Sequence, residues 1–262
     1  PMCIQYSRLR QPAPKPEQAS LSLIGLADAP RVFTLDELRH LPQQSRRLTL
    51  VCAANSLKVG QWETRVWTGI PLAALLAEAG VSPEAQSVQI AGYDGALQRI
   101  ALSDLDGALL ALEADGHPLS AAQGYPARLL IPGQSACAMP RYVQRMMFRA
   151  ETVPPLNAPS PRVMIDRVQA VEGGARLEGM AFAATAVAVR LDDGPAVAVS
   201  VSESAAGLAG HWALDWPGAG ASRARFSAEP LPLAAQPEAR PLARRWKAQR
   251  AVWKPAQGQN RS

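Results

Sequence analysis

A single cysteine at the end of an apolar run is the residue of this chain best suited to chemistry. Residues 48–51 read Leu-Thr-Leu-Val, and Cys52 follows them, ahead of Ala53, Ala54 and Asn55. The pattern predicts a buried strand that delivers one thiol, beside small residues that let a bulky group approach. Such a thiol suits a soft-metal ligand or a nucleophile. Because free cysteines are among the most buried residues of proteins, an inert core cysteine is an open alternative from this segment alone.

The other cysteines and the histidines do not form a familiar metal motif. The chain has three cysteines, without CxxC or CxxCH spacing, and three histidines in unrelated contexts: Cys3, Cys52, Cys137, His40, His117 and His211. We therefore expect neither a structural zinc nor a covalently attached c-type haem.

Two later segments give Cys52 a context. Residues 67–72 read Trp-Thr-Gly-Ile-Pro-Leu, and residues 124–133 read Gly-Tyr-Pro-Ala-Arg-Leu-Leu-Ile-Pro-Gly. With Cys-Ala-Ala-Asn at 52–55, this ordered set resembles the sulfite oxidase family of molybdenum enzymes, which includes sulfite dehydrogenases and sulfane dehydrogenase molybdenum subunits. The family pattern runs C-A-G-N, then W-[ST]-G-[VI]-P-L, then G-[YF]-P-x-R-[LV]-[LV]-[VI]-P-G. The resemblance implies a molybdenum-molybdopterin cofactor held through one protein thiolate.

The resemblance also assigns roles to residues of the chain. It makes Cys52 the metal ligand, Arg8 the residue that faces an anionic substrate, and Arg128 the partner of the pterin phosphate. A solvent-exposed arginine is the alternative for Arg8. The full predicted site comprises three catalytic residues and five cofactor-binding residues: Cys52, Arg8 and Tyr93, then Arg10, Asn55, Trp67, Arg128 and Arg141.

The pattern also departs from the family near the substrate. Ala54 replaces a glycine, Ser56 and Leu57 replace two arginines, Gln123 and Gln144 replace a histidine and a lysine, and residues 137–139 look like an insertion. The family's active-site tyrosine falls near Ala96, where the neighbouring candidate is Tyr93. A site with fewer cations would bind sulfite less strongly, since each charge-assisted hydrogen bond contributes about 1.5–3 kcal/mol.

The expected fold class is α+β, with a sulfite oxidase-type molybdopterin-binding domain over residues 1–157. Thr34 and Glu37 have the spacing of a capping box, and Pro71 is expected at the first position of a second helix. A strand over 127–133 contains Arg128, which needs an anionic partner or a route to solvent because an unpaired buried charge costs several kcal/mol.

A second domain is expected over residues 158–262. Prolines 154, 155, 159 and 161 interrupt secondary structure, and short alternating strands follow at 186–191, 197–201, 211–216 and 222–228. The resemblance makes this an immunoglobulin-like β-sandwich that mediates dimerisation. Residues 240–261 form a basic tail without an acidic residue, in a chain of 27 basic and 22 acidic side chains. A solvated or partner-facing tail is favoured over a nucleic-acid arm, because no nucleic-acid-binding module precedes it.

The chain contains no apolar stretch of the length that spans a membrane. The function that the resemblance favours is that of a periplasmic oxidoreductase that oxidises sulfite or another reduced sulfur compound and passes electrons to a separate cytochrome c or haem subunit, as a dimer or hetero-complex. The compartment is implied by the family, and no export signal is visible. The alternatives are the same cofactor with a different oxo-transfer substrate, and a non-catalytic subunit that keeps the fold.

Overall fold

The protein, represented here by a computed structural model, divides into two compact units, Pro1–Pro159 and Ser160–Ser262. The structure describes residues 14–28, 30–51, 62–157, 161–192, 194–202, 209–217, 224–232 and 249–253. Among the described residues, strands are the commonest regular elements of both units. Within the described residues, no helix has the length and apolar character needed to cross a membrane.

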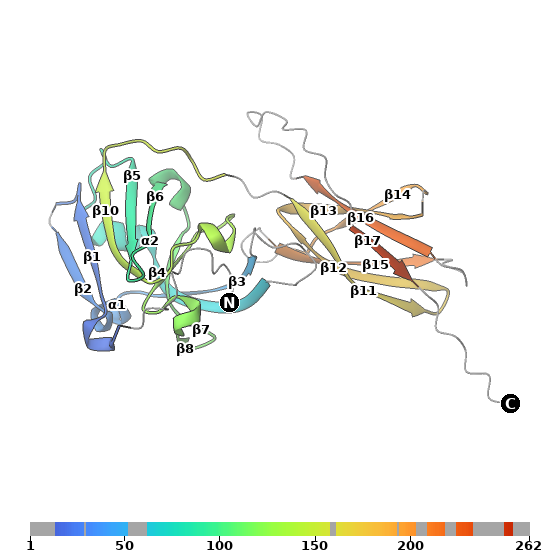
Figure 1. Ribbon diagram of the computed structural model, residues 1–262, viewed down its shortest axis with the longest axis horizontal. Helices are drawn as coiled ribbons and strands as arrows, with labels where there is room; N and C mark the ends of the chain where they lie inside the picture. Colours follow the sequence, from blue (N-terminus) through green and yellow to red (C-terminus); the bar gives the residue numbers. More distant parts are fainter. Residues whose placement is uncertain are drawn as a thin grey trace. The chain divides into compact units, whose positions relative to one another are not determined.

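The first unit contains a five-stranded sheet in which distant parts of the chain lie side by side (Figure 1). Its order is β2-β1-β10-β5-β6, and only the β1–β10 pair is parallel. The strands are β1 (Ser20–Gly25), β2 (Arg31–Thr34), β5 (Ser87–Gly92), β6 (Leu97–Ala101) and β10 (Val143–Arg149). Alternate residues such as Leu21, Leu23 and Phe148 are buried, as expected for strands with one face on a core.

A second sheet in this unit carries the motif segments. Its order is β3-β4-β7-β8, with β9 paired to β7. The strands are β3 (Gln44–Val51), β4 (Trp62–Pro71), β7 (Leu109–Ala114), β8 (His117–Pro118) and β9 (Arg128–Leu130). A Cβ at Gly69 would come within 2.1 Å of the Leu110 carbonyl oxygen, so this glycine lets β4 approach β7. The register sets Gly69 opposite Ala111 and Ala111 opposite Arg128.

Two short helices follow strands of the first unit. The predicted capping box at α1 (Leu35–His40) is confirmed, because the Glu37 N–H donates to Thr34 Oγ1 at 3.2 Å and the Thr34 N–H donates to Glu37 Oε2 at 2.7 Å. Helix α2 (Leu72–Glu78) begins one residue later than expected, since Pro71 is its N-cap. The 3-10 turns are η2 (Pro16–Gln18), η4 (Leu102–Leu105), η5 (Ala121–Gln123) and η6 (Ala136–Ala138).

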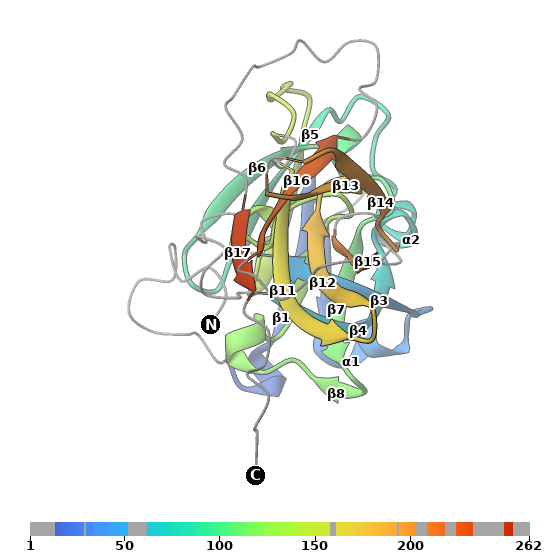
Figure 2. The ribbon, with the colours of Figure 1, turned by 90° about the vertical axis from the view of Figure 1, so that its right-hand side faces the viewer.

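The second unit consists of two antiparallel sheets (Figure 2). One has the order β11-β12-β15 and the other β14-β13-β16-β17. The strands are β11 (Arg162–Val171), β12 (Gly174–Phe182), β13 (Ala184–Leu191), β14 (Ala196–Ser200), β15 (Ala209–Pro217), β16 (Ala224–Pro232) and β17 (Gln249–Trp253). Both sheets contribute to one core, which contains Leu177 and Trp212 from the first sheet and Val187 and Val189 from the second.

The expected strands in this unit are present, and the structure adds three. The β11–β12 hairpin precedes the first expected strand, and β17 lies inside the segment that we interpreted as a basic tail. The register places Ala224 opposite Trp253 and Ala228 opposite Gln249. Part of the predicted tail is therefore a strand of the four-stranded sheet.

Candidate functional site

The structure describes four of the eight predicted site residues. These are Trp67, Tyr93, Arg128 and Arg141, whereas Cys52, Arg8, Arg10 and Asn55 lie outside the described residues. Strand β3 ends at Val51, opposite Trp62 of β4. The predicted ligand Cys52 is thus the next residue after the last described pair of this hairpin. Across the described ranges, no group of three or more His, Cys, Asp or Glu side chains could hold a metal ion.

Arg128 is the central feature of the described site. Its side chain is only 2 % exposed, and it comes from the short strand β9 of the Gly-Tyr-Pro-Ala-Arg motif. Its Nη1 donates to the Gln123 carbonyl and its Nη2 to the Ala136 carbonyl, both at 3.4 Å, which is long for such bonds. Its Nε has no hydrogen-bond partner among the described residues. The guanidinium is therefore buried with unused donor capacity.

The pKa of Arg128 also indicates a buried charge without a close counter-ion. Burial, and then the nearby charge of Arg141, lower the pKa of Arg128 to about 10. Glu63 opposes this shift but is itself paired with Arg65. No carboxylate within the described part of the chain forms an ion pair with Arg128. A bound anion would offset the free-energy cost of burying the positive charge and would accept a hydrogen bond from the Arg128 Nε.

Trp67, on strand β4 of the same sheet, lies beside Arg128. The indole is fully buried, and its Nε1 donates to the Leu48 carbonyl of β3 at 3.4 Å. The Arg128 guanidinium carbon lies 5.8 Å from the centre of the Trp67 ring, within reach of a cation–π contact. The structure thus brings two predicted cofactor-binding residues together, one from each of two motifs that are 61 positions apart.

A sharp backbone turn at Tyr142 holds Arg141 beside the Gly-Tyr-Pro motif. Tyr142 has φ of 57°, which is unusual for a residue with a side chain, and it separates Arg141 from the start of β10. The Tyr142 N–H donates to the Gly124 carbonyl at 3.0 Å. A Cβ at Gly124 would lie 2.9 Å from the Arg141 Cβ. The glycine of the Gly-Tyr-Pro motif therefore leaves room for the Arg141 stem.

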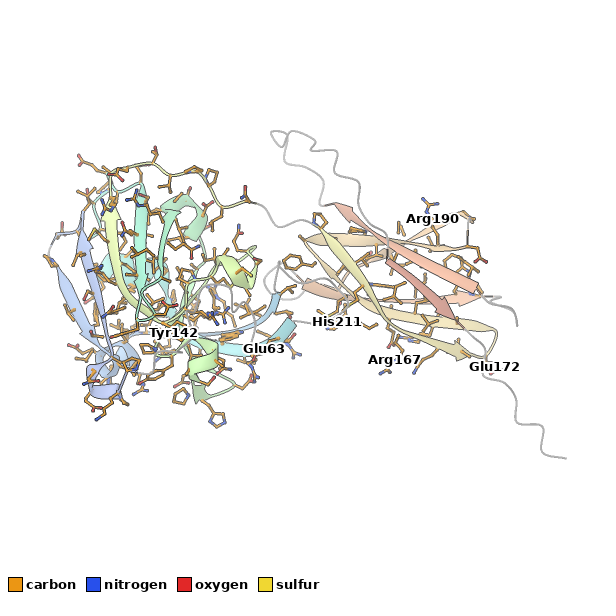
Figure 3. The ribbon with its side chains drawn as sticks, viewed as in Figure 1. Glu63, Tyr142, Arg167, Glu172, Arg190 and His211 are labelled. Carbon is orange, nitrogen blue, oxygen red and sulfur yellow. The ribbon has the colours of Figure 1, made fainter. Side chains whose placement is uncertain are left out.

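Two tyrosines with buried hydroxyl groups were missed as site residues by the sequence reasoning. Tyr142, labelled in Figure 3, is fully buried, and its hydroxyl has no hydrogen-bond partner in the described part of the chain. The Tyr125 hydroxyl is also buried without a described partner. Burial raises the pKa of both phenols, so both are neutral donors near pH 7. Their positions within the Gly-Tyr-Pro and Arg-Tyr-Val-Gln segments were the available signal.

The backbone of Tyr93 is close to Arg141, because its N–H donates to the Tyr142 carbonyl at 2.9 Å, but its hydroxyl contacts the start of β1. Its hydroxyl accepts a hydrogen bond from the Ser20 N–H at 2.8 Å, and the Ser20 and Gln18 carbonyls lie within 3.1 and 3.2 Å of it. These contacts fix the start of β1 to the residue after β5. The predicted catalytic role of Tyr93 stays a prediction, and its hydroxyl is already occupied by backbone groups.

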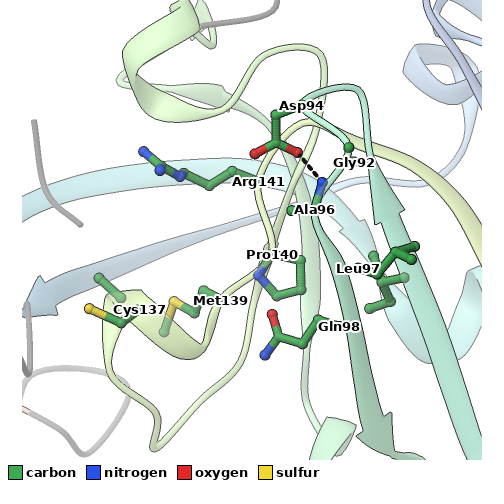
Figure 4. A pocket seen from close by; sticks show the side chains of 12 residues that line it. Gly92, Asp94, Ala96, Leu97, Gln98, Cys137, Met139, Pro140 and Arg141 are labelled. Atoms are coloured by element: carbon green, nitrogen blue, oxygen red, sulfur yellow. Dashed lines mark hydrogen bonds between the residues drawn. The ribbon is translucent and has the colours of Figure 1, made fainter. Parts of the chain in front are cut away.

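A cavity of about 830 Å³ adjoins the arginines (Figure 4). Arg141 lines it, and so does Ala136, whose carbonyl accepts from Arg128. Its other described lining residues come from β5, the β5–β6 turn, β6 and residues 137–140. Cys137 lines it as well and is disulfide-bonded.

These features fit a phosphate-bearing cofactor. A phosphate needs several donors and a compensating positive charge, and the region around Arg128 offers its Nε and the buried Tyr142 hydroxyl as polar atoms without a described partner. Arg128 is also buried without a carboxylate partner among the described residues.

Comparisons with known proteins identify the family. Residues 9–155 match the family described as the oxidoreductase molybdopterin binding domain. Curated relatives include inducible nitrate reductase (NADH) 2 of Glycine max, 28 % identical over 58 % of this chain and 21 % of its own length, and nitrate reductase (NADPH) of Phytophthora infestans, 32 % identical over 56 % and 19 %. The chain spans about a fifth of these relatives.

A solved structure shows the same fold. The sulfane dehydrogenase SoxCD from Paracoccus pantotrophus matches with a TM-score of 0.69 and 22 % identity, over 83 % of this chain and 68 % of that chain. The family match covers more than half of the chain and includes the Trp67 and Arg128 motifs. The chain therefore belongs to the sulfite oxidase family of molybdopterin oxidoreductases, and its cofactor is molybdenum-molybdopterin.

Proposed function

We propose that this molybdenum oxidoreductase oxidises sulfite or a related reduced sulfur compound and passes the electrons to a separate cytochrome c. The observation that carries the proposal is Arg128, a buried guanidinium on a tryptophan face with an unpartnered Nε. It supplies the fixed positive charge that a pterin phosphate requires. The solved structure with the same fold is that of a sulfane dehydrogenase, which supports a reduced sulfur substrate.

The proposed division of labour follows from residue chemistry. Arg128 would hold the cofactor phosphate, Trp67 would fix the plane of the guanidinium, and Cys52 would be the sole protein ligand of the metal. When bound, the cofactor supplies two-electron redox chemistry at a metal that favours soft thiolate ligands. Arg141 would add a second positive charge to the cofactor site, and Arg8 would attract and orient an anionic substrate.

Nitrate reduction is the competing function, because the curated relatives include nitrate reductases. Sulfite oxidation releases two electrons as water supplies the added oxygen, whereas nitrate reduction consumes two electrons and releases water. We expect sulfite to bleach the visible absorption of the oxidised, molybdenum-loaded protein. We also expect cytochrome c reduction to follow sulfite addition.

Measurements on the same preparation distinguish between the competing functions. Nitrate-dependent reoxidation of the dithionite-reduced protein, without a response to sulfite, would replace the sulfur function with nitrate reduction. A purified chain that contains no molybdenum would favour the non-catalytic subunit. Loading with molybdenum, together with inertness toward both anions, would favour a different oxo-transfer substrate.

We further propose an immunoglobulin-like dimerisation domain for residues 158–262 and a periplasmic location. Seven described antiparallel strands in two sheets around one core support the domain assignment. The disulfide of Cys137 supports an oxidising compartment, since such bonds are rare in the cytosol. We propose a hetero-complex as well, which the likeness to sulfane dehydrogenase SoxCD supports. The haem-bearing electron acceptor in it is the partner that the family resemblance implies.

The N-terminal arginine gives a kinetic prediction. Arg8→Gln should raise the KM for sulfite about tenfold or more, because lost charge-assisted contacts commonly exceed about 1.4 kcal/mol. The effect should shrink as ionic strength rises, since part of it is long-range attraction. Steady-state kinetics at two salt concentrations test this. Unchanged sulfite kinetics would identify Arg8 as an ordinary exposed arginine.

The cysteine chemistry gives a second prediction. Within a chain of three cysteines, a disulfide at Cys137 and a metal-bound Cys52 can coexist only if Cys137 pairs with Cys3. Alkylation of the unreduced, denatured protein followed by peptide mass mapping should therefore label Cys52 and recover a peptide that links Cys3 to Cys137. Recovery of a peptide that links Cys52 to Cys137 from the molybdenum-loaded protein would contradict the ligand assignment.

A further inference from the structure

The five-stranded sheet of the first unit has one face on the core and one face turned away from it. Leu21, Phe33, Ile90 and Met146 are each 1 % exposed and belong to the core face. Because successive side chains of a strand point to opposite faces, the residues next to them belong to the other face, which we call the open face. The strand register aligns one residue of each strand in a row across it: Val32, Ser22, Arg145, Ala91 and Leu97.

The two ends of this row are apolar and solvent-exposed. Val32 is 60 % exposed and Leu97 is 63 % exposed, which makes them the most exposed large apolar side chains of the described residues. They belong to the two edge strands, β2 and β6, and Arg145 belongs to the central strand β10. Four steps of about 4.8 Å between neighbouring strands set the two ends about 19 Å apart. The row thus has a charge at its centre and an apolar side chain at each end.

The charge on the open face is positive. Arg145 is exposed and forms no ion pair within the described residues. Arg99 and Arg149 alternate with core-facing residues in the same way, and they share the Glu151 carboxylate at 3.4 and 3.9 Å. These side chains bring three positive charges against one negative charge. A partner surface that combines carboxylates with apolar side chains complements them.

The open face is the reverse side of strands that line the cavity. Ile90 of β5 and Gln98 of β6 line it, as does Arg141, the predicted cofactor residue four positions before Arg145. Leu97 borders the cavity too, and Figure 4 shows its side chain apart from that of Gln98. Packed protein layers are about 10 Å apart. A redox protein on the open face would therefore lie about one layer from a cofactor in this cavity, which is a short path for an electron.

The size and charge of the open face favour a transient partner over a second copy of this chain. Strands of six residues and a width of about 19 Å give an area on the order of 400 Å². Transient redox contacts bury less than about 1,200 Å² in total, whereas permanent dimers commonly bury more than about 2,000 Å². In a two-fold symmetric contact centred on this face, Arg145 would also meet its own copy, and like charges repel.

We propose that the open face docks an acidic electron-accepting protein, with carboxylates of the partner on Arg145 and apolar side chains of the partner on Val32 and Leu97. The inference rests on the proposed function, because the electrons come from the reduced cofactor. The cofactor gives up two electrons, one to each of two one-electron acceptors that dock in turn, and the protons of the substrate reaction go to water. The inference deepens that function by assigning the docking surface and the charge of the acceptor.

Cytochrome c with succinylated lysines is the probe, because it is acidic and accepts one electron, and untreated, basic cytochrome c is its counterpart. The full, molybdenum-loaded chain is reduced with dithionite, freed of the excess, and mixed with each probe while the haem absorption is followed. Arg145→Glu should lower the rate constant for the acidic probe about tenfold or more at low ionic strength and raise it for the basic probe. High salt should remove both effects. Val32→Ser should lower the rate about threefold at every salt concentration, because the lost contact is apolar.

Arg47→Glu is the matched control, because Arg47 is an exposed arginine on β3 of the other sheet. It should leave both rates within about twofold, and reoxidation by ferricyanide at high salt should be equal in all variants with an intact cofactor. Equal rates for the wild type and Arg145→Glu would overturn the proposal, as would equal effects of Arg145→Glu and Arg47→Glu. Sulfite is absent from these measurements. A loaded protein that does not respond to sulfite therefore contradicts the proposed function alone, whereas unaltered rates in Arg145→Glu contradict this inference alone.

Discussion

Replacing Cys52 with serine should reduce turnover below detection while the protein still folds. Strand β3 pairs with β4 along residues 44–51, and this ladder ends at Val51, before the substituted position. A serine hydroxyl is nearly the size of a thiol but is a poor ligand for a soft metal. The loss should therefore fall on the metal site and spare the sheet.

Absorption at the molybdenum edge measures this directly. The Cys52→Ser protein should have one fewer sulfur neighbour at the metal than the wild type, with an unchanged far-ultraviolet circular dichroism spectrum. Cys3→Ser is the matched control, and it should keep the wild-type number of metal–sulfur contacts. If Cys52→Ser retains that number too, another thiolate is the ligand and the assignment of Cys52 is wrong.

Local sequence signals predicted the features that depend on neighbouring residues. The Thr34–Glu37 capping box is such a feature, because both partners lie within one helical turn. The burial of Arg128 was predicted in the same way, from a single charge inside an apolar run. The sequence also indicated that a buried Arg128 needs an anionic partner. It did not indicate where in the protein that anion lies.

Features made by contacts between distant segments escaped the sequence reasoning. The Tyr93 hydroxyl bonds to Gln18 and Ser20, more than 70 positions earlier in the chain. Strand β17 pairs with β16 across a long interval, and its composition had indicated a charged tail. The left-handed backbone at Tyr142 depends on its bond to Gly124 and on the space that this glycine provides. None of these has a local pattern that identifies the partner.

The second large effect is expected at Arg128, where stability and cofactor binding should respond in opposite directions. Burial lowers the pKa of Arg128 from its ordinary value to about 10, which corresponds to a cost on the order of 3 kcal/mol for holding the charge in the folded protein. The sign follows from protonation: below pH about 10 the guanidinium is charged in both the folded and unfolded chains, so the folded state carries the penalty throughout the neutral range. In the apoprotein no described carboxylate offsets it. Buried ionic groups of this kind are often replaced by apolar side chains without loss of stability.

Arg128→Met should therefore leave the unfolding free energy of the apoprotein unchanged or raise it by about 1–3 kcal/mol, as measured by urea denaturation. The same substitution should weaken cofactor binding by at least about a hundredfold, because two charge-assisted hydrogen bonds together contribute about 3–6 kcal/mol to binding. The measurement is a lower molybdenum content of the purified protein than in the wild type. The cofactor affinity of Arg128→Lys should lie between those of the wild type and Arg128→Met, since lysine keeps the charge and loses the planar guanidinium that stacks on Trp67.

Arg145→Met, at an exposed position on β10, controls for the loss of one positive charge. An Arg128→Met apoprotein that is several kcal/mol less stable, yet carries its full molybdenum content when loaded, would show that the guanidinium stabilises the fold through the Gln123 and Ala136 carbonyls and does not bind the cofactor.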